Sequence, residues 1–463
     1  MSTLAPPRLD RTLSSAPAAP PVRIVHLGIG NFHRAHQAWY TWRAPDGAGW
    51  GIAAFTGRRP DAAEALAPQD GLYTLITRSA DADRFELIGS LAEVRPAADH
   101  DRFLELLAAP ETALVTITVT EAGYRLGADG HLADSEPVRA DVEALRADSR
   151  AAVTTTPGKL VAGLLARRAA GSGALTILSC DNLPHNGEVA RTVVSDLAAQ
   201  LDAGLVDWID DHVEFASSMV DRITPATTEA DRDLVVESQG YRDASPVPTE
   251  PFSEWVVAGS FPAGRPAWEA AGARLVDDVA PYEQRKLTLL NGSHSLMAYA
   301  GSIRGHESID EAIADPAVRG WVEAFWDEAE PHLLLSGTQI ADYRTALLER
   351  YRNPRIRHRL AQIAADGSAK IGVRILPTVR AERAAGRRPT GCATVLAAWV
   401  LHLRGAGAPI NDAGGQPYVA AAAAEDVRDA VQAVIARLDT TLGTDQTLVD
   451  AVVRQTERLR DRS

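Results

Sequence analysis

The segment VRIVHLGIGNFHRAH, residues 22–36, limits the fold of this chain more than any other part of the sequence. Its apolar run at 23–27 ends in glycine, as a buried parallel strand does. Gly28 and Gly30 then match the first two glycines of a dinucleotide-binding turn, where they allow a tight turn and a close approach of backbone to pyrophosphate. The third glycine of that pattern is missing, so the segment alone is equally consistent with a simple turn.

Two histidines follow where the third glycine is expected. His33 and His36 are three residues apart and share a face of the predicted helix, which raises the question of a metal site. Four-coordinate zinc needs further ligands, and neither a CxxC nor an HExxH motif accompanies the pair. We therefore expect no bound metal, and we interpret these histidines as residues that cap the helix or line a pocket.

Strand and helix patterns alternate over the first part of the chain. Apolar runs at 51–55, 113–120 and 174–179 predict buried strands, and the two runs within 72–90 predict a hairpin. The helical pattern from Arg34 to Arg43 and an amphipathic helix before residue 171 separate these strands. Such alternation is typical of an α/β fold with ligands at the carboxyl ends of the strands.

After about residue 280 nearly every segment has a helical pattern. A chain of 463 residues is also too long for one compact core. We expect a flexible leader at 1–21, a Rossmann-type dinucleotide-binding domain at 22–279, and a mostly α-helical domain at 280–463 that carries substrate-binding and catalytic residues.

Composition excludes several classes of function. A net charge of −14 argues against a nucleic-acid partner, and no apolar run approaches the ~18 residues needed to cross a membrane. The leader lacks the apolar segment of a signal peptide, and two cysteines imply no disulfide framework. We expect a cytoplasmic enzyme with a small-molecule substrate, as a monomer or small homo-oligomer.

The end of the second predicted strand bears on the cofactor. An acidic residue there usually binds the ribose of NAD. This chain has Arg58 and Arg59 instead, and two arginines suit the 2'-phosphate of NADP. The alternative is that both are solvated loop charges.

The segment YEQRKLTLLNGSHS, residues 282–295, combines polar and apolar residues in an unusual way. At α-helical spacing four of its polar residues fall within an arc of roughly 140°: Glu283, Lys286, Asn291 and His294. An exposed polar stripe would explain the pattern, and so would catalysis. A lysine can take the proton of an alcohol if burial lowers the pKa of its ammonium group from ~10.4 toward neutrality. An asparagine amide can hold the alkoxide, a histidine can orient the substrate, and a carboxylate can relay the proton.

Seven segments together resemble the long-chain, metal-independent polyol dehydrogenases, the family of mannitol 2-dehydrogenase and fructuronate (mannonate) reductase. The resemblance covers nearly the whole chain after the leader. Its segments are HLGIGNFHRAHQAWYT (26–41), TVTEAGY (118–124), LSCDNLPHNG (178–187), SMVDRITP (218–225), EPFSEWVV (250–257), KLTLLNGSHS (286–295) and NPRIRHRLAQIAADGSAK (353–370). The family's own turn is Gly-x-Gly-x-Phe-x-Arg-x-His, so the missing third glycine is a family feature.

The resemblance implies a role for each matching residue. Lys286 resembles the general base, and Asn182 and Asn291 resemble the two amides of the oxyanion pocket. His294 matches the substrate-orienting histidine, and Glu283 matches the carboxylate through which the proton leaves. The remaining matches are the sugar-site residues Asp221 and Lys370 and the pyrophosphate turn Gly28, Gly30, Asn31 and Phe32.

Two positions depart from the family pattern. Mannitol enzymes often carry arginine eight residues before the last lysine, where this chain has Gln362, as the sugar-acid reductases do. A carboxylate substrate needs an arginine, which Arg355, Arg357 or Arg374 supplies. Many family members also have an acidic residue at the position of this chain's TGRRP segment, which contains Arg58. The resemblance to the family therefore favours NAD, whereas the positive charge of the arginines favours NADP.

We therefore expect an NAD(P)-dependent oxidoreductase, with NAD as the first choice, that interconverts a mannitol-like polyol and a ketose. One alternative is a fructuronate (mannonate) reductase acting on a sugar acid. An alternative of another class is a non-catalytic nucleotide-binding sensor.

Overall fold

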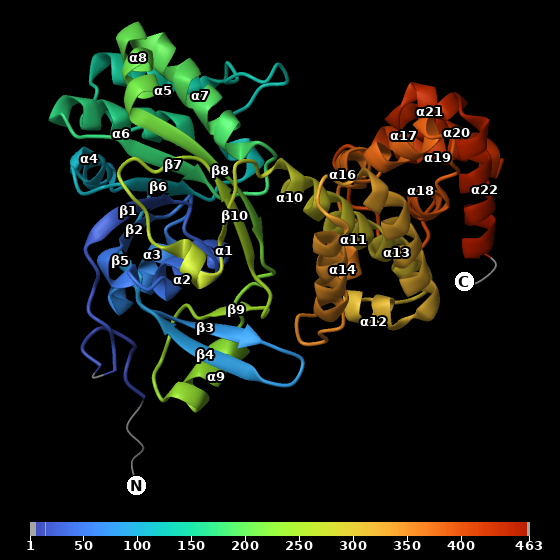
Figure 1. Ribbon diagram of the computed structural model, residues 1–463, viewed down its shortest axis with the longest axis horizontal. Helices are drawn as coiled ribbons and strands as arrows, with labels where there is room; N and C mark the ends of the chain where they lie inside the picture. The colour runs from blue at the N-terminus through green and yellow to red at the C-terminus, as the bar shows by residue number, and fades with distance from the viewer. Residues whose placement is uncertain (1–5, 14, 461–463) are drawn as a thin grey trace. The chain divides into compact units, whose positions relative to one another are not determined.

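The computed structural model describes residues 6–13 and 15–460 and divides the chain into two compact units, Met1–Ala280 and Pro281–Ser463 (Figure 1). Unit 1 is built on a mostly parallel sheet, and unit 2 is helical. The expected class, a Rossmann-type α/β domain followed by a helical domain, is confirmed.

Unit 1 contains all the strands of the described chain. They are β1 (Val22–Leu27), β2 (Gly51–Phe55), β3 (Tyr73–Arg78), β4 (Asp83–Ile88), β5 (Leu91–Arg95), β6 (Leu114–Ile117), β7 (Leu175–Ser179), β8 (Val213–Asp221), β9 (Val247–Thr249), β10 (Glu254–Ala258) and β11 (Arg274–Leu275). Its helices are α1 (Asn31–Ala35), α2 (Gln37–Arg43), α3 (Asp61–Leu66), α4 (His100–Ala108), α5 (Glu136–Ala147), α6 (Thr156–Ala170), α7 (Asn186–Leu201), α8 (Ala203–His212) and α9 (Glu229–Gln239). Short 3₁₀ turns are η1 (Gly47–Gly49), η2 (Ala67–Gln69), η3 (Glu121–Gly123) and η4 (Trp268–Ala271).

The main sheet has the strand order β11-β10-β8-β7-β6-β1-β2-β5. The six strands from β8 to β5 run parallel, and β10 pairs antiparallel with β8. Because parallel strands end at the same edge, the loops after β1, β2, β6, β7 and β8 share one edge of the sheet. The predicted hairpin is also present: β3 and β4 pair antiparallel, and together with β9 they form a second, three-stranded sheet.

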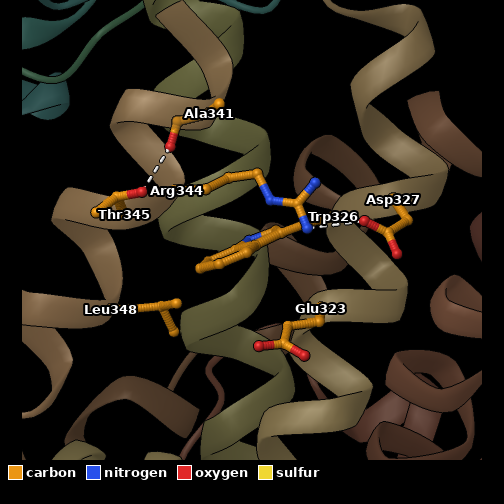
Figure 2. A pocket seen from close by; sticks show the side chains of 7 residues that line it. All are labelled: Glu323, Trp326, Asp327, Ala341, Arg344, Thr345 and Leu348. Carbon is orange, nitrogen blue, oxygen red and sulfur yellow. Dashed lines mark hydrogen bonds and ion pairs between the residues drawn. The ribbon is translucent and has the colours of Figure 1, made fainter. Parts of the chain in front are cut away.

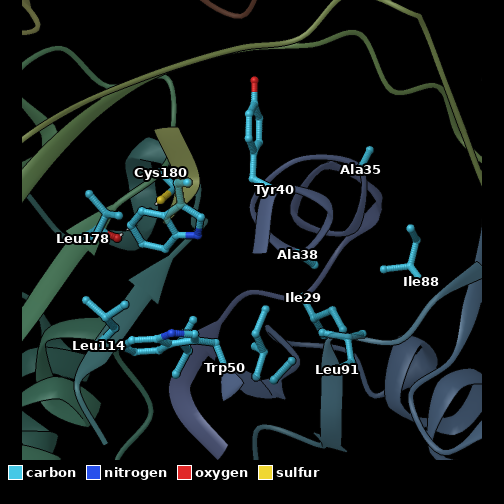
Figure 3. Close-up of a cluster of buried hydrophobic side chains, with 14 of the residues drawn as sticks. Ile29, Ala35, Ala38, Tyr40, Trp50, Ile88, Leu91, Leu114, Leu178 and Cys180 are labelled. Atoms are coloured by element: carbon cyan, nitrogen blue, oxygen red, sulfur yellow. Dashed lines mark hydrogen bonds between the residues drawn. The ribbon is translucent and has the colours of Figure 1, made fainter. Parts of the chain in front are cut away.

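Apolar residues cover both faces of the main sheet, which explains the continuous apolar runs in its strands. Val25 and Leu27 of β1 pack into one core with the helices α4, α6 and α7, which lie on one side of the sheet in Figure 1. Ile24 of the same strand packs into the other core with α1 and α2. Figure 3 shows that second core around Trp50, Tyr40 and the buried Cys180.

Two features of unit 1 differ from expectation. The helix predicted from Arg34 begins at Asn31 and breaks at His36, where φ is −122° and ψ is −93°. Part of the expected flexible leader is packed: Leu9 is fully buried, and the Arg11 guanidinium donates to four backbone carbonyls. Local composition predicted a leader without contacts because all of these partners except Pro17 lie far away in the sequence. Residues 1–5 and 14 of the leader lie outside the described residues.

Unit 2 is a helical bundle around α18 (Thr390–Leu403), an apolar helix buried almost throughout, which packs against α13 and α22 and contains the buried Cys392. The other helices are α10 (Ala280–Arg285), α11 (Ser293–Leu296), α12 (Ile309–Ala314), α13 (Pro316–Ala329), α14 (Gly337–Tyr351), α15 (Leu360–Ala364), α16 (Gly367–Arg374), α17 (Leu376–Ala384), α19 (Gln416–Ala422), α20 (Val427–Leu438), α21 (Thr440–Thr444) and α22 (Gln446–Arg460). Two π-helical segments, η5 (Lys286–Gly292) and η6 (Met297–Gly301), and a 3₁₀ turn, η7 (Glu330–His332), complete the unit. Over residues 6–13 and 15–460, no helix has both the length and the hydropathy that a bilayer span requires.

Candidate active site

The turn after β1 requires glycine at its first position. Gly28 has φ +100°, and a Cβ built on it would lie 2.1 Å from the carbonyl oxygen of Thr118. Its backbone N–H and that of Ile29 donate to the carbonyl of Phe55, both at 3.0 Å. The hydroxyl of Thr118 donates to the Gly28 carbonyl at 2.9 Å. The turn is therefore held between the ends of β2 and β6, and only glycine fits there.

The second glycine is not required by the protein itself. Gly30 has extended backbone, with φ −144° and ψ −174°. The nearest atom to a Cβ built there is the carbonyl oxygen of Gly28, at 3.9 Å. The backbone thus leaves room at the start of α1, where a dinucleotide pyrophosphate binds in Rossmann-type domains. The turn fits the phosphates of a dinucleotide.

The side chains of Asn31 and Phe32 make contacts within unit 1. The Asn31 amide donates to the carbonyl of Pro225 at 3.1 Å and to the hydroxyl of Thr227 at 3.0 Å, and its oxygen accepts from Arg34 at 2.6 Å. The ring of Phe32 stacks on that of His36 with centroids 5.1 Å apart. The Asn31 side chain is therefore occupied by contacts within unit 1. For its predicted cofactor-binding role, only its backbone is left.

The histidines of the turn are core residues. His26 and His33 are fully buried and stack with ring centroids 3.3 Å apart. Burial lowers the pKa of His26 to about 3 and that of His33 well below its ordinary value, so both rings are neutral. His36 is also buried, with Nε2 3.1 Å from the Glu254 carbonyl. Among the described residues, no group of three or more His, Cys, Asp or Glu side chains is placed to hold a metal.

Both arginines after β2 are exposed. Thr56 is buried, and its hydroxyl accepts from the backbone N–H of Ala97 at 2.9 Å. Arg59 forms an exposed ion pair with Asp61 at 3.3 Å. Arg58 is exposed at the same edge of the sheet as the glycine turn. Its predicted contact with the cofactor ribose or its 2'-phosphate stays a prediction.

The loop after β7 carries Asn182, which is exposed. The preceding residue, Asp181, accepts hydrogen bonds from the Tyr124 hydroxyl and, at 3.1 Å, from the backbone N–H of Leu183. Burial raises the pKa of the Asp181 carboxyl to about 6. Sequence reasoning missed Tyr124 and Asp181, although both stand in the segments TVTEAGY and LSCDNLPHNG. Their contact joins those two segments and fixes the loop that presents Asn182.

Asp221 is the last residue of β8 and is buried, in register with Glu254 of β10. The neighbouring Arg222 is also buried, donates to the carbonyls of Ala35 and Glu250, and has its pKa lowered to about 10 by burial. Because β8 is parallel to β7, Asp221 lies at the same sheet edge as the glycine turn, Arg58 and Asn182. Unit 1 thus brings its predicted site residues to one edge.

Unit 2 carries the lysine in a helix with an unusual turn. Residues 280–301, called the lysine helix below, contain the two π-helical segments. The sequence-based arc assumed α-helical spacing, and that assumption is wrong for residues 286–292. Lys286 and Asn291 are five residues apart, about 1.4 turns of an α-helix but close to one turn of a π-helix with its i→i+5 bonding. The wide turn therefore brings both side chains toward the same side, and both are half-buried, as is Glu283.

His294 lies in the α-helical segment between the two wide turns and is buried. Its ring is 5.3 Å from that of Tyr351 and 5.3 Å from that of His358, to which it is nearly perpendicular. Burial lowers the pKa of His358, so this ring is neutral. Sequence reasoning assigned no role to Tyr351 or His358, although His358 stands in the motif NPRIRHRL. No local pattern marks either residue, because helix packing brings them to His294.

Helix α16 carries two cations, Lys370 and Arg374, of which Arg374 contacts the lysine helix. The Nη1 of Arg374 donates to the carbonyl of Asn291 at 3.2 Å and to the hydroxyl of Ser295 at 3.1 Å, and burial lowers the pKa of Arg374 to about 10. Lys370 donates to the carbonyls of Ile363 and Ala365, and burial, then Arg374, lowers its pKa. Gln362 is exposed on α15. Arg374 thus lies directly beside a predicted catalytic residue, whereas Gln362 makes no such contact among the residues described.

Two family profiles cover almost the whole chain. The mannitol dehydrogenase Rossmann domain matches residues 22–270, and the mannitol dehydrogenase C-terminal domain matches residues 278–460. The chain belongs to the mannitol dehydrogenase family. It is therefore an oxidoreductase with a Rossmann domain for a nicotinamide dinucleotide, and the alternative of a non-catalytic sensor is not favoured.

Named relatives within the family differ in substrate. The chain is 39% identical over 394 residues to the D-mannonate oxidoreductase of Escherichia coli, covering 83% of this chain and 80% of that protein. It is 40% identical over 404 residues to the D-arabinitol 4-dehydrogenase of Ralstonia nicotianae, covering 85% of each. The structure of Pseudomonas fluorescens mannitol 2-dehydrogenase, a ternary complex with NAD and D-mannitol, matches with a TM-score of 0.79 and 36% identity over 96% of this chain and 92% of that one.

Proposed function

We propose that this chain is a metal-independent, nicotinamide-dependent dehydrogenase that interconverts a secondary alcohol of a mannitol-like polyol and the corresponding ketose. The observation that carries the proposal is the wide turn of the lysine helix. It brings the amine of Lys286 and the carboxamide of Asn291 toward one side of a helix in which Leu289 and Leu290 are buried. When bound, the nicotinamide accepts hydride from the alcohol carbon or returns it to the ketone.

Each predicted residue then has a defined task. Lys286 in its neutral form accepts the hydroxyl proton during oxidation and donates it during reduction. The amide N–H of Asn291 donates to the substrate oxygen as negative charge develops there, and we assign the same task to Asn182. His294 orients the substrate, and Glu283, one turn before the lysine, passes the proton toward solvent.

Unit 1 supports a dinucleotide cofactor, for which we propose NAD. The backbone at Gly28, Gly30 and Phe32 receives the pyrophosphate at the start of α1. The family relative solved with NAD supports this choice. Exposed Arg58 is the feature that favours NADP instead, so the two cofactors are compared directly below.

The proposal is tested by replacing the base. Lys286→Met removes the amine, and Lys286→Arg keeps a positive charge that does not deprotonate. Mannitol oxidation, followed at the reduced-nicotinamide absorbance band, should fall about a thousandfold in both variants, within the range for loss of a general base. The NAD dissociation constant should stay unchanged, because the glycine turn lies in unit 1. Wild-type turnover in either variant would remove the lysine from the mechanism.

Two further measurements complete this test. Wild-type oxidation should rise with pH as the Lys286 ammonium loses its proton, and ketose reduction should be favoured at lower pH. Full activity after exhaustive treatment with a chelator is expected for a reaction that needs no metal. Loss of activity that added zinc restores would contradict that part of the proposal.

A specific observation favours a sugar acid as the second candidate substrate. Lys370 and Arg374 are partly buried cations that donate only to neutral oxygens, and among the described residues no carboxylate lies within ion-pair distance of either. Asp366 and Asp412 offset part of the charge of Lys370. Among the described residues, no carboxylate acts in this way on Arg374. Because partly buried charge without a counter-ion is costly, a substrate carboxylate beside Arg374 would compensate for it. Mannitol and mannonate should be offered in parallel. Preference for mannonate, with an Arg374→Met variant whose KM rises more for mannonate than for mannitol, would establish the reductase.

A further inference from the structure

Side chains supply hydrogen-bond donors to consecutive carbonyls of the lysine helix. The Leu289 carbonyl accepts from the indole Nε1 of Trp326 at 3.0 Å and from the Ser293 hydroxyl at 2.5 Å. The same hydroxyl lies 3.1 Å from the Leu290 carbonyl. Ser293 itself is 2.7 Å from the hydroxyl of Tyr351. All of these donors and acceptors are buried.

These donors bear directly on the width of the turn. In an α-helix each carbonyl accepts from the backbone N–H four residues later, and in a π-helix from the N–H five residues later. A serine that donates to the carbonyl four residues earlier already bends a helix. The indole N–H of Trp326 adds a second donor to that same carbonyl, from outside the helix. The Leu289 carbonyl thus has two side-chain donors, Ser293 and Trp326, and does not depend on the α-helical backbone hydrogen bond.

Trp326 lies on α13 in a closely packed region. Its neighbour Phe325 approaches the lysine helix so closely that a Cβ on Gly292 would lie 2.7 Å from the ring. On the indole itself lies Arg344, with its guanidinium 5.4 Å from the ring centroid and ion pairs of 2.7 Å to Asp327 and to Glu330. Figure 2 shows this stack in the wall of a surface pocket of about 310 Å³. The indole is fully buried beneath it.

We propose that Trp326 is a positioning residue for the reaction: its N–H bond to the Leu289 carbonyl holds the wide turn that brings Lys286 and Asn291 to the same side of the helix. Without this bond the turn relaxes toward α-helical spacing, and the amide turns away from the amine. This inference rests on the proposed roles of Lys286 and Asn291. Trp326 itself acts only through the helix backbone.

Trp326→Phe tests the inference, because it removes the N–H and keeps an aromatic ring. We expect kcat for oxidation to fall about 10- to 100-fold, as for a misplacement on the order of 1 Å. The NAD dissociation constant should be unchanged, and the rise of oxidation rate with pH should move to higher pH as the amine becomes more hydrated. Trp321→Phe is the matched control on the same helix and should leave kcat and the pH profile unchanged.

Ser293→Ala provides a second measurement if Trp326→Phe does not fold. It removes the other donor to Leu289 and should lower kcat and shift the pH profile in the same direction. Wild-type kcat and pH profile in whichever of these variants folds would overturn the inference, and so would equal losses in Trp326→Phe and Trp321→Phe. Failure of the proposed function is recognised separately, because Lys286→Met would then keep its turnover whatever Trp326→Phe shows.

Discussion

The glycine turn of unit 1 and the lysine helix of unit 2 are both unusual backbone segments, but different interactions hold them. Gly28 is fixed mainly by backbone atoms of Phe55, the last residue of β2, and of Thr118, which follows β6, and the Thr118 hydroxyl adds one hydrogen bond. The lysine helix is fixed by side chains, among them the indole of Trp326, 37 residues after the carbonyl it binds. Backbone constraint leaves a signature in the local sequence, whereas side-chain constraint does not.

The largest effect should come from the turn. Gly28→Ala combines a positive φ with contact between the new Cβ and the Thr118 carbonyl, and should destabilise unit 1 by more than about 3 kcal/mol. Gly30→Ala should unfold like the wild type but bind NAD at least about tenfold more weakly, since its methyl group enters the space left for phosphate. Denaturant unfolding and NAD titration measure the two effects. Equal stability of both variants would remove the distinction between the two glycines.

A glycine of the lysine helix should give an intermediate effect. Gly292→Ala has an ordinary backbone conformation, so its cost comes only from contact of the new methyl with the Phe325 ring, about 1–3 kcal/mol. Because the helix must move to relieve this contact, kcat should also fall. Gly320→Ala, where a Cβ meets nothing within 4 Å, is the matched control. An unchanged kcat in Gly292→Ala would show that the wide turn does not depend on this packing.

Acid should weaken the support of the glycine turn. His26 hydrogen-bonds to Thr118, and its folded-state pKa of about 3 lies below the ordinary value of 6.5. Below pH 6.5 the unfolded chain therefore binds a proton at His26 that the folded protein does not bind. The free energy of unfolding decreases as the pH falls below 6.5, by about 2 kcal/mol at pH 5 for this group. His33 acts in the same direction. Asp181 opposes it, because its pKa is raised to about 6 and protonation favours the folded state below that pH.

Thermal unfolding between pH 7.5 and 5 measures this balance. The melting temperature of unit 1 should decrease with acidification, and His33→Phe should make the decrease shallower. A melting temperature that rises over this range would mean that Asp181 outweighs the two histidines.

The smallest effect concerns the cofactor. Arg58→Ala should weaken NADP binding by about three- to tenfold, the scale of an exposed charge interaction, and leave NAD binding unchanged. Arg59→Ala is the matched control, because Arg59 is already paired with Asp61. Fluorescence titration with both cofactors is sufficient. Equal NADP affinity for wild type and Arg58→Ala would assign Arg58 to the solvated surface.

The comparison also explains what the sequence could predict. Strands such as 23–27 and 51–55 were identified because burial on both faces imposes a continuous apolar run. The glycine turn was found because positive φ selects glycine. The break at His36 and the wide turn after Lys286 were not predicted, because distant partners override local helical spacing. Tyr124, His358 and Trp326 were missed for the same reason: their contacts arise only from tertiary packing.

The burial of both cysteines has a practical consequence. Cys180 and Cys392 are fully buried, and burial raises the pKa of each thiol, so neither supplies the thiolate that alkylating reagents and peroxides attack. The protein should tolerate storage without a reductant. A cysteine introduced at an exposed position outside the proposed site, such as Glu111, would then be the single reactive thiol, so a spectroscopic probe can be attached there without first removing the natural ones.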